Sequence, residues 1–319
     1  MIERRTIVYP HPLLDGVEHP AFEARGAKDG PRLSLIGGIH GCEYSSIAAV
    51  TRFMNELDPI ELAGTITAVP VVSMQSFKRR SPFLVPEDGK NLNRSFPGSL
   101  EGSYTDVLAR SIFDELISPA DVFIDLHGGD MVEDLEPFAI YEESGSSDVD
   151  ARARGVALAF GLPLVVREQR HEGGLGGMTI SGAAQAGVPG IIAEAGGRGQ
   201  LEEDAVQLLV TGVRNALRYL EMLPGDPEPP ARPMRTVGSF VWLRSQHEGW
   251  WDAAVRAGDE VAEGGLLGRI RNLWGDELQE IHAPRDGVVL FSTMSPAVEA
   301  DGILLGLGAD LAAVGVPAS

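Results

Sequence analysis

The N-terminal two thirds of the chain alternate short apolar runs with longer segments whose apolar positions recur every three or four residues. The short runs predict buried strands; they cover residues 32–39, 65–72, 121–126 and 188–193. The longer segments predict amphipathic helices; they cover residues 44–57 and 201–220. This alternation predicts an α/β fold with helices on both faces of a sheet. Such sheets bind ligands beyond the carboxyl ends of their strands, so we expect chemistry in the loops that follow them.

A proline-rich segment divides the chain into two unequal parts. Residues 223–233 (LPGDPEPPARP) can continue neither a helix nor a central strand, so they predict a stiff linker. Residues 1–222 are expected to form the larger, catalytic domain. Residues 234–319 consist of short β-prone pieces separated by Gly and Asp turns, which predicts a smaller all-β domain.

The turn spacing of residues 234–319 resembles that of a lipoyl or biotinyl carrier domain. No lysine follows the linker, however, because the only lysines of the chain are Lys28, Lys78 and Lys90. Covalent lipoylation or biotinylation of this domain is therefore excluded. A structural role, or one in covering a pocket, is favoured instead.

The charge balance argues against two classes of partner. Lys and Arg number 26 against 46 Asp and Glu, which gives a formal net charge of −20 and a pI near 4.7. Nucleic acids and anionic membrane surfaces both attract clustered Lys and Arg, so we expect no nucleic-acid and no membrane partner. The acidic surface favours solubility or a saline habitat; attraction of a cationic substrate is the alternative.

Cysteine content and hydropathy exclude several further classes of protein. Cys42 is the only cysteine, which excludes an intrachain disulfide and thiolate-rich zinc or iron–sulfur sites. No apolar run reaches the ~18 residues that a membrane-spanning helix needs. Residues 1–15 carry charges and prolines in place of a hydrophobic signal core, so a cytoplasmic location is expected.

The segment Gly37-Gly38-Ile39-His40-Gly41-Cys42-Glu43 carries the strongest chemical signal. It lies where the first predicted strand ends and a predicted helix begins. On a helical first turn, His40 and Glu43 would share one face and could hold one Zn²⁺. A catalytic zinc commonly takes two histidines, one glutamate and a water, so a third protein ligand is needed. Cys42 lies out of phase with both and is expected to pack rather than to ligate.

His127 is the best candidate for the third ligand. It follows the strand predicted at residues 121–126, in the sequence Asp125-Leu126-His127-Gly128-Gly129. If the strand continues that far, Asp125 and His127 point to one face, and the carboxylate could orient the imidazole.

Two further clusters supply groups for binding and proton transfer. In NLNRSFPG, Asn93 and Arg94 suit bidentate capture of a substrate carboxylate. Upstream, Arg80 could polarise a scissile carbonyl, with Arg79 as a competitor that is better interpreted as a surface charge. Glu194 ends an apolar strand before a glycine turn and could transfer protons.

One histidine in a glycine-rich segment is a weaker candidate. His171, in RHEGGLGG, is mainly interpreted as a loop residue, with substrate contact as the alternative. The glycines at 173–177 suggest a mobile or tightly turning loop. They do not suggest a phosphate-binding loop, because no GKS or GKT sequence follows them.

Taken in order, the motifs HGCE, NLNRSFPG, DLHGG and AEAGG resemble the succinylglutamate desuccinylase/aspartoacylase family, a branch of the zinc carboxypeptidase superfamily. The resemblance spans about residues 30–220 and the β domain. With GKNLNR, the chain looks most similar to bacterial N-acyl-amino-acid deacylases. Some relatives have Asp where this chain has Asn91, which argues against an aspartoacylase-type specificity.

The resemblance implies a fold, a cofactor and a set of residue roles. The fold is an α/β one with a mixed, zinc carboxypeptidase-like sheet flanked by helices. One Zn²⁺ per chain would be held by His40, Glu43 and His127. Glu194 would act as general base and acid and Arg80 as the carbonyl-polarising residue. Asn93 and Arg94 would bind a substrate carboxylate.

The leading hypothesis is a zinc-dependent hydrolase that cleaves the amide bond of a small N-acylated amino acid or a similar carboxylate-bearing amide. A carboxypeptidase acting on short peptides is the alternative within enzymes. A non-catalytic relative that binds a metabolite is the alternative outside them. The sequence leaves open whether the chain forms a homo-oligomer, and which acyl and amino-acid parts the substrate has.

Overall fold

A long mixed sheet organises the protein, whose computed structural model describes residues 1–169 and 177–314. Thirteen strands belong to this sheet. In chain order they are β1 Ile2–Val8, β2 Glu18–Arg25, β3 Lys28–Gly37, β4 Ala63–Val69, β7 Val122–His127, β8 Glu133–Leu135, β9 Phe138–Glu143, β10 Leu164–Gln169, β11 Gly190–Glu194, β12 Arg235–Arg244, β14 Glu260–Val261, β17 Gly287–Thr293 and β19 Ile303–Ala313.

The order of these strands places the ends of β3, β7 and β11 side by side. The full order is β1-β2-β4-β3-β7-β11-β9-β10-β12-β19-β17-β14, with β8 paired to β17. Strands β4, β3, β7 and β11 run parallel, whereas β9 is antiparallel to β11. The expected mixed α/β sheet is confirmed, and its parallel centre brings three carboxyl ends to one edge.

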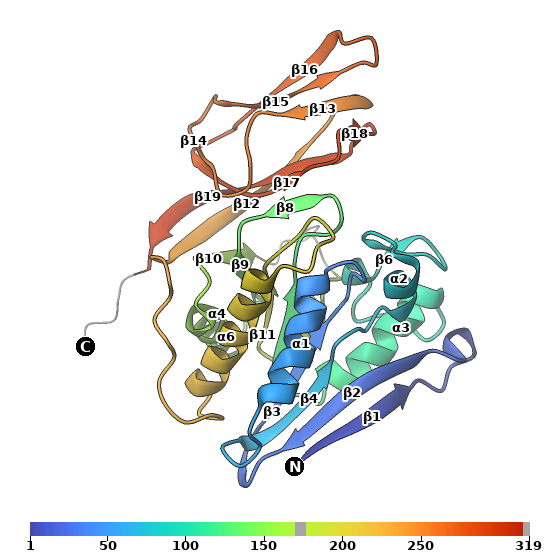
Figure 1. Ribbon diagram of the computed structural model, residues 1–319, viewed down its shortest axis with the longest axis vertical. Coiled ribbons are helices and arrows are strands. Elements are labelled where there is room, and N and C mark those ends of the chain that lie inside the picture. Colours follow the sequence, from blue (N-terminus) through green and yellow to red (C-terminus); the bar gives the residue numbers. More distant parts are fainter. Residues whose placement is uncertain (170–176, 315–319) are drawn as a thin grey trace.

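Helices cover both faces of the sheet, as the alternating pattern predicted. Helices α1, α4 and α6 lie side by side on one face (Figure 1), and α3 and α5 pack together in the core of the other face. The helices are α1 Tyr44–Glu56, α2 Met74–Arg79, α3 Tyr104–Ile112, α4 Ser147–Phe160, α5 Thr179–Gln185 and α6 Glu203–Tyr219, with shorter turns at Pro12–Leu14, Leu92–Arg94 and Phe113–Ile117. The four predicted strands correspond to β3, β4, β7 and β11, and the two predicted helices to α1 and α6.

Alternation along the central strands decides which side chains reach the site. In β7, Ile124 and Leu126 pack into the core beneath α1, α4 and α6. Phe123 packs on the opposite face with residues of α3. Because successive side chains point to opposite faces, Asp125 and His127 share the face of Phe123.

The C-terminal region is rich in strands, as predicted, but it is not a separate sheet. Strand β12 pairs in parallel with β10, and β19, β17 and β14 continue the larger sheet from there. A four-stranded sheet lies beyond them and consists of β13 Gly249–Ala253, β15 Leu266–Arg271, β16 Glu277–His282 and β18 Ala297–Val298. The fully described stretch 223–233 contains neither helix nor strand. The proposed division at 222 and 234 therefore stays a prediction.

In the part of the chain that the structure describes, no helix combines the length and the apolarity that a membrane crossing requires.

Asp88 fixes the start of the segment that carries Asn93 and Arg94. Its Oδ2 accepts hydrogen bonds from the hydroxyl of Ser103 at 2.6 Å and from the backbone N–H of Thr105 at 2.8 Å. Both donors lie at the beginning of α3, so the carboxylate ties the segment to a helix N-terminus, where negative charge is favoured. Burial acts to raise the pKa of Asp88, but the bonds from Ser103 and Thr105 outweigh it and lower the pKa.

We expect Asp88→Asn to lower the free energy of unfolding by about 1–2 kcal/mol at pH 7, because charge-assisted hydrogen bonds are lost at a partly exposed site. A depressed folded-state pKa contributes stability above the unfolded pKa of about 3.9 and loses it as the pH falls through the folded value. The variant and the wild type should therefore converge in acid. Urea unfolding at several pH values measures this, with the exposed Asp226→Asn as control. Equal midpoints at pH 7 would contradict the assignment.

Candidate metal centre and active-site cavity

His40 and Glu43 lie in the loop between β3 and α1, not on the first helical turn as the spacing predicted. Helix α1 begins at Tyr44, and Glu43 has the non-helical backbone angles of a helix cap (φ −87°, ψ 69°). The loop is held tightly against α2, because a Cβ on Gly41 would lie 2.1 Å from the backbone nitrogen of Phe77. The tight loop brings the two side chains together without a helix: His40 Nδ1 is 2.7 Å from Glu43 Oε1.

His127 is the last residue of β7, so the strand continues far enough to place Asp125 on the same face. His127 Nε2 lies 2.9 Å from Asp125 Oδ2. That carboxylate oxygen also accepts a hydrogen bond from the hydroxyl of Thr179, at 2.7 Å, at the start of α5. Asp125 is fully buried and His127 is 1% exposed, so the imidazole is fixed from behind by a carboxylate that is itself anchored.

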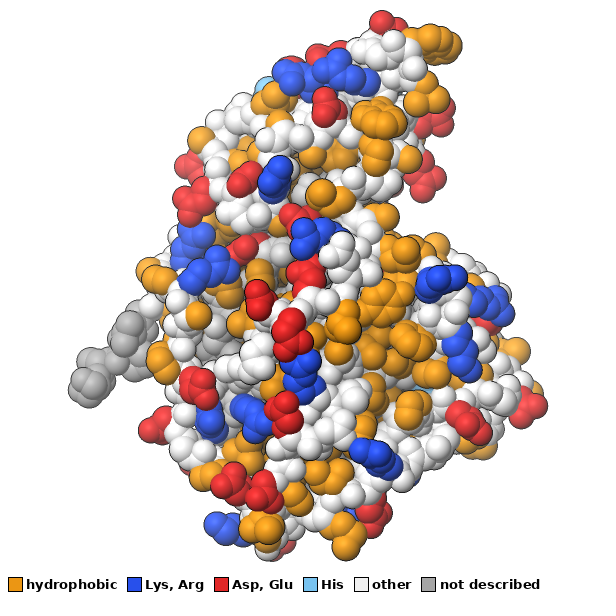
Figure 2. Space-filling model, in the orientation of Figure 1, with side chains coloured by type: hydrophobic (Ala, Val, Ile, Leu, Met, Phe, Trp, Pro, Cys, Tyr) orange, Lys and Arg blue, Asp and Glu red, His pale blue; other side chains and the backbone are white. Residues whose placement is uncertain are grey.

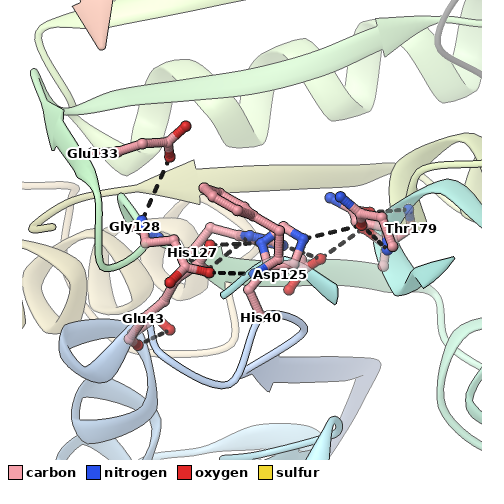
Figure 3. Close-up of polar contacts among 12 residues, drawn as sticks. His40, Glu43, Asp125, His127, Gly128, Glu133 and Thr179 are labelled. Atoms are coloured by element: carbon pink, nitrogen blue, oxygen red, sulfur yellow. Dashed lines mark hydrogen bonds and ion pairs between the residues drawn. The ribbon is translucent and has the colours of Figure 1, made fainter. Parts of the chain in front are cut away.

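Glu43 joins the two imidazoles (Figure 3). Its Oε2 lies 3.0 Å from His127 Nδ1 and accepts a hydrogen bond from the backbone N–H of Gly128 at 3.2 Å. Both Nδ1 atoms therefore face Glu43. Both Nε2 atoms are occupied on the outside, that of His127 by Asp125 and that of His40 by Asn91 Oδ1 at 3.1 Å.

Charges inside this cluster stabilise one another. Burial acts to raise the pKa of Glu43, but His127 and His40 outweigh it and lower the pKa to about 2. Burial acts to lower the pKa of His127, but the carboxylates of Asp125 and Glu43 raise it well above its usual value. A deprotonated carboxyl group and a protonated imidazole are the charged partners of a buried ion pair.

The cluster fits a single divalent cation. One donor atom from each of His40, Glu43 and His127 lies within 4.8 Å of the other two. Two imidazole nitrogens and one carboxylate oxygen form the donor set of many catalytic zinc sites. All three side chains also line a cavity of about 610 Å³, so a substrate could reach such an ion. The structure thus brings together the three residues that the sequence singled out.

Glu194 lies in the same cavity. It is the last residue of β11, directly opposite His127 in the parallel register of β11 and β7. Burial, with the charges of Glu43 and Glu133, raises the pKa of Glu194 well above its usual value, against the opposing effect of His127. A carboxyl group beside the metal-binding cluster can exchange protons there.

Asn93 and Arg94 also line the cavity, in the short turn Leu92–Arg94. Asn93 is buried, and its Oδ1 accepts a hydrogen bond from the backbone N–H of Thr179 at 2.9 Å. The other end of this amide is an NH₂ group, which is a hydrogen-bond donor. Arg94 donates from Nη1 to the backbone carbonyl of Asn93 at 2.6 Å. The pair presents donors to the cavity, which suits a carboxylate.

Arg80 is not among the described residues that line the cavity. It is exposed and ends α2 with a left-handed backbone (φ 54°). Arg79 is exposed as well and forms an ion pair with Glu87 at 3.2 Å. The geometry therefore adds no support for a carbonyl-polarising role of Arg80.

Of two other residues that the sequence raised, the structure describes only Cys42. Cys42 is buried, and burial raises its pKa to about 11, which disfavours the thiolate that a nucleophile needs. His171 lies outside the described residues.

The sequence reasoning missed two groups of cavity residues. Glu133, at the start of β8, lies in the cavity, where burial and the charge of Glu43 raise its pKa to about 7. Phe240, Trp242 and Phe291 reach the cavity from β12 and β17. Glu133 lies in a run of acids (EDLE) that gave no distinct signal, and the aromatic residues follow the linker, where no contact with the site could be read from the chain.

Comparison with known proteins gives matches over most of the chain. A model of the succinylglutamate desuccinylase/aspartoacylase catalytic domain matches residues 29–220. A curated protein of Halomonas elongata, N-alpha-acetyl-L-2,4-diaminobutyric acid deacetylase, is 29% identical over 269 residues, which cover 82% of this chain and 77% of the relative.

Solved structures share the fold at low identity. A succinylglutamate desuccinylase/aspartoacylase from Rhodobacter sphaeroides has a TM-score of 0.83 and 24% identity, covering 99% of this chain and 96% of its own. The product-bound ectoine utilization protein EutE (DoeB) from Ruegeria pomeroyi has a TM-score of 0.85 and 24% identity, covering 96% of this chain and 95% of its own.

We expect His127→Ala to lose divalent-metal binding, because two of three protein ligands hold a catalytic ion far more weakly. Elemental analysis after dialysis should find about one zinc per chain in the wild type and a small fraction of that in the variant. The exposed His282→Ala serves as control and should retain the metal. Equal zinc content in all three proteins would exclude ligation by His127.

Proposed function

The chain belongs to the succinylglutamate desuccinylase/aspartoacylase family, and from this premise we propose that it is a zinc-dependent deacylase. Its reaction is the hydrolysis of the amide bond of a small N-acylated amino acid. The family resemblance carried by the ordered motifs is confirmed, and with it a hydrolase that acts on carbon–nitrogen bonds other than peptide bonds.

The observation that carries the proposal is the position of Glu194 beside the three-residue cluster. Glu194 and His127 end neighbouring strands in register, and His127 contacts Glu43. A zinc ion held by His40, Glu43 and His127 would acidify water and polarise the amide carbonyl. Glu194 would be the group that accepts a proton from the attacking water and returns it to the leaving amine. We choose zinc as the metal because of the donor set of two imidazoles and one carboxylate, and because the family resemblance implies it.

Asn93 and Arg94 are proposed to hold the carboxylate of the amino-acid half. Their donors face the cavity that contains the cluster, so a bound carboxylate would fix the amide relative to Glu194. The curated relative acts, by its name, on an N-acetylated diamino acid. We therefore place the substrate among N-acyl amino acids. Arg80 is kept as the candidate carbonyl-polarising residue on the family resemblance alone.

A carboxypeptidase acting on short peptides is the alternative to exclude. The curated relative supports the deacylase over the carboxypeptidase, because by its name it deacetylates an N-acetylated diamino acid. Incubation with N-acyl amino acids and with dipeptides of the same residues separates the two functions, and cleavage of the dipeptides alone would reject the deacylase.

We expect Glu194→Gln to lower kcat by roughly 10²–10⁴-fold, because the amide cannot accept or return a proton. Zinc content should stay unchanged, since Glu194 is not one of the three ligands. Paired measurements of turnover and bound metal test this, with the exposed Glu263→Gln as matched control. A fully active Glu194→Gln enzyme would reject the proposed role.

We expect Arg94→Ala to raise KM by at least about tenfold, because a bidentate contact to the substrate carboxylate is removed. Arg79→Ala, also at an arginine but on the surface, should leave KM unchanged. A substrate in which the carboxylate is replaced by a carboxamide provides the second control. Wild type and Arg94→Ala should then have similar KM values, and a persisting difference would show that Arg94 acts on another group.

A further inference from the structure

Three aromatic side chains from the C-terminal strands form a continuous wall in the cavity. Phe240 and Trp242 lie on β12, with their rings stacked at 4.7 Å and 10°. The ring of Phe291, on β17, lies 5.3 Å from that of Trp242 and 6.2 Å from that of Phe240. All three residues line the cavity that also contains the metal-binding cluster. We refer to these three residues as the aromatic wall.

The aromatic wall is connected to the reaction centre through the sheet. Glu194 pairs with His127 on one side and with Phe138 on the other, so the three side chains stand in one row on the same face. Adjacent strands lie about 4.8 Å apart, which places Phe138 roughly 10 Å from His127 along the row. The ring of Phe138 lies 6.2 Å from that of Phe240. A ligand group leaving Glu194 in this direction therefore reaches the wall.

Part of the cavity surface is apolar. Phe138, Ile140 and Ile192 belong to the lining, which also includes charged residues such as Arg94, Glu168 and Arg244. Figure 2 also shows hydrophobic side chains gathered between the C-terminal strands and the segment of α2 and β6 (Lys90–Asn91). The cavity volume of about 610 Å³ lies within the roughly 300–1,000 Å³ that drug-sized ligands occupy. An acetyl group would leave most of this apolar surface uncovered.

The placement of polar groups indicates which half of the substrate faces the wall. Asn93, the proposed carboxylate anchor, is bound to Thr179. In Figure 3, Thr179 and Glu133 lie on opposite sides of the two imidazoles. Glu133 pairs with Thr293 of β17, the strand that carries Phe291. With the amino-acid half held on the side of Thr179, the acyl half points to the side of β17.

We propose that the aromatic wall binds the acyl group of the substrate and that the preferred acyl group is apolar and larger than acetyl, of the size of benzoyl or hexanoyl. This inference rests on the proposed deacylase function. Burial of such a group against Trp242 removes apolar surface of both partners from water. In a hydrophobic pocket, one methylene group changes selectivity by roughly 10–200-fold. The wall thus determines acyl specificity and has no part in bond cleavage.

The test compares N-acetyl, N-hexanoyl and N-benzoyl derivatives of one amino acid. The wild type should have a kcat/KM at least about tenfold higher for the two larger acyl groups. Trp242→Ala should lose at least about tenfold on these two and less than about threefold on the acetyl substrate. Trp274→Ala is the matched control, because Trp274 is 88% exposed and is not a cavity residue. If Trp242→Ala does not fold, Trp242→Leu replaces it.

A second series keeps the acyl group constant and varies the amino-acid side chain. A loss in Trp242→Ala confined to this series would overturn the inference, because the wall would then bind the amino-acid half. An acetyl preference in the wild type would also overturn it. If no derivative is hydrolysed, the proposed function fails, and the wall is tested by calorimetric binding of the N-benzoyl compound. Equal affinity in wild type and Trp242→Ala would reject the wall independently of turnover.

Discussion

One buried carboxylate determines how the site is built. Glu43 is 4% exposed and contacts the Nδ1 atoms of both His40 and His127. A carboxylate removed from water to this degree is tolerated only if its charge is compensated. Two imidazoles and the N–H of Gly128 provide that compensation, and Asp125 and Asn91 hold the imidazoles from outside. The same contacts that make the buried charge tolerable also point three donor atoms at one place.

The sheet register then arranges the remaining groups around that place. His127, Glu194 and Phe138 end or begin neighbouring strands β7, β11 and β9 and stand opposite one another. Because β9 runs antiparallel to β11, a strand start lies beside two strand ends. Across three strands, the row therefore passes from the candidate ligand His127 through Glu194, the proposed proton-transfer group, to the apolar Phe138.

Local sequence patterns predicted much of this arrangement. They did not predict the parts of the site that depend on long-range contacts. Apolar runs followed by glycine predicted β3, β7 and β11, and these strands deliver His40, His127 and Glu194 to one edge. The helical turn expected at His40 was wrong, because packing of Gly41 against α2 sets the loop conformation instead. Glu133 reaches the cavity where β8 pairs with β17, across a sequence separation that no periodicity encodes. Trp242 does so because β12 extends the sheet beyond β10.

The residues proposed for the chemistry and those proposed for acyl specificity lie in different parts of the chain. The three candidate ligands, Glu194 and the Asn93–Arg94 pair all lie within residues 29–220, the part that matches the family's catalytic domain. The aromatic wall comes from β12 and β17, which lie outside that part. Substitutions in these strands can change the shape of the cavity without touching the cluster or its register. Strand β12 is hydrogen-bonded to β10. A side chain substituted on β12 would therefore keep a fixed position relative to the candidate metal-binding cluster. If the aromatic wall binds the acyl group as proposed, the continuous sheet would let specificity vary while the candidate metal-binding cluster stays unchanged.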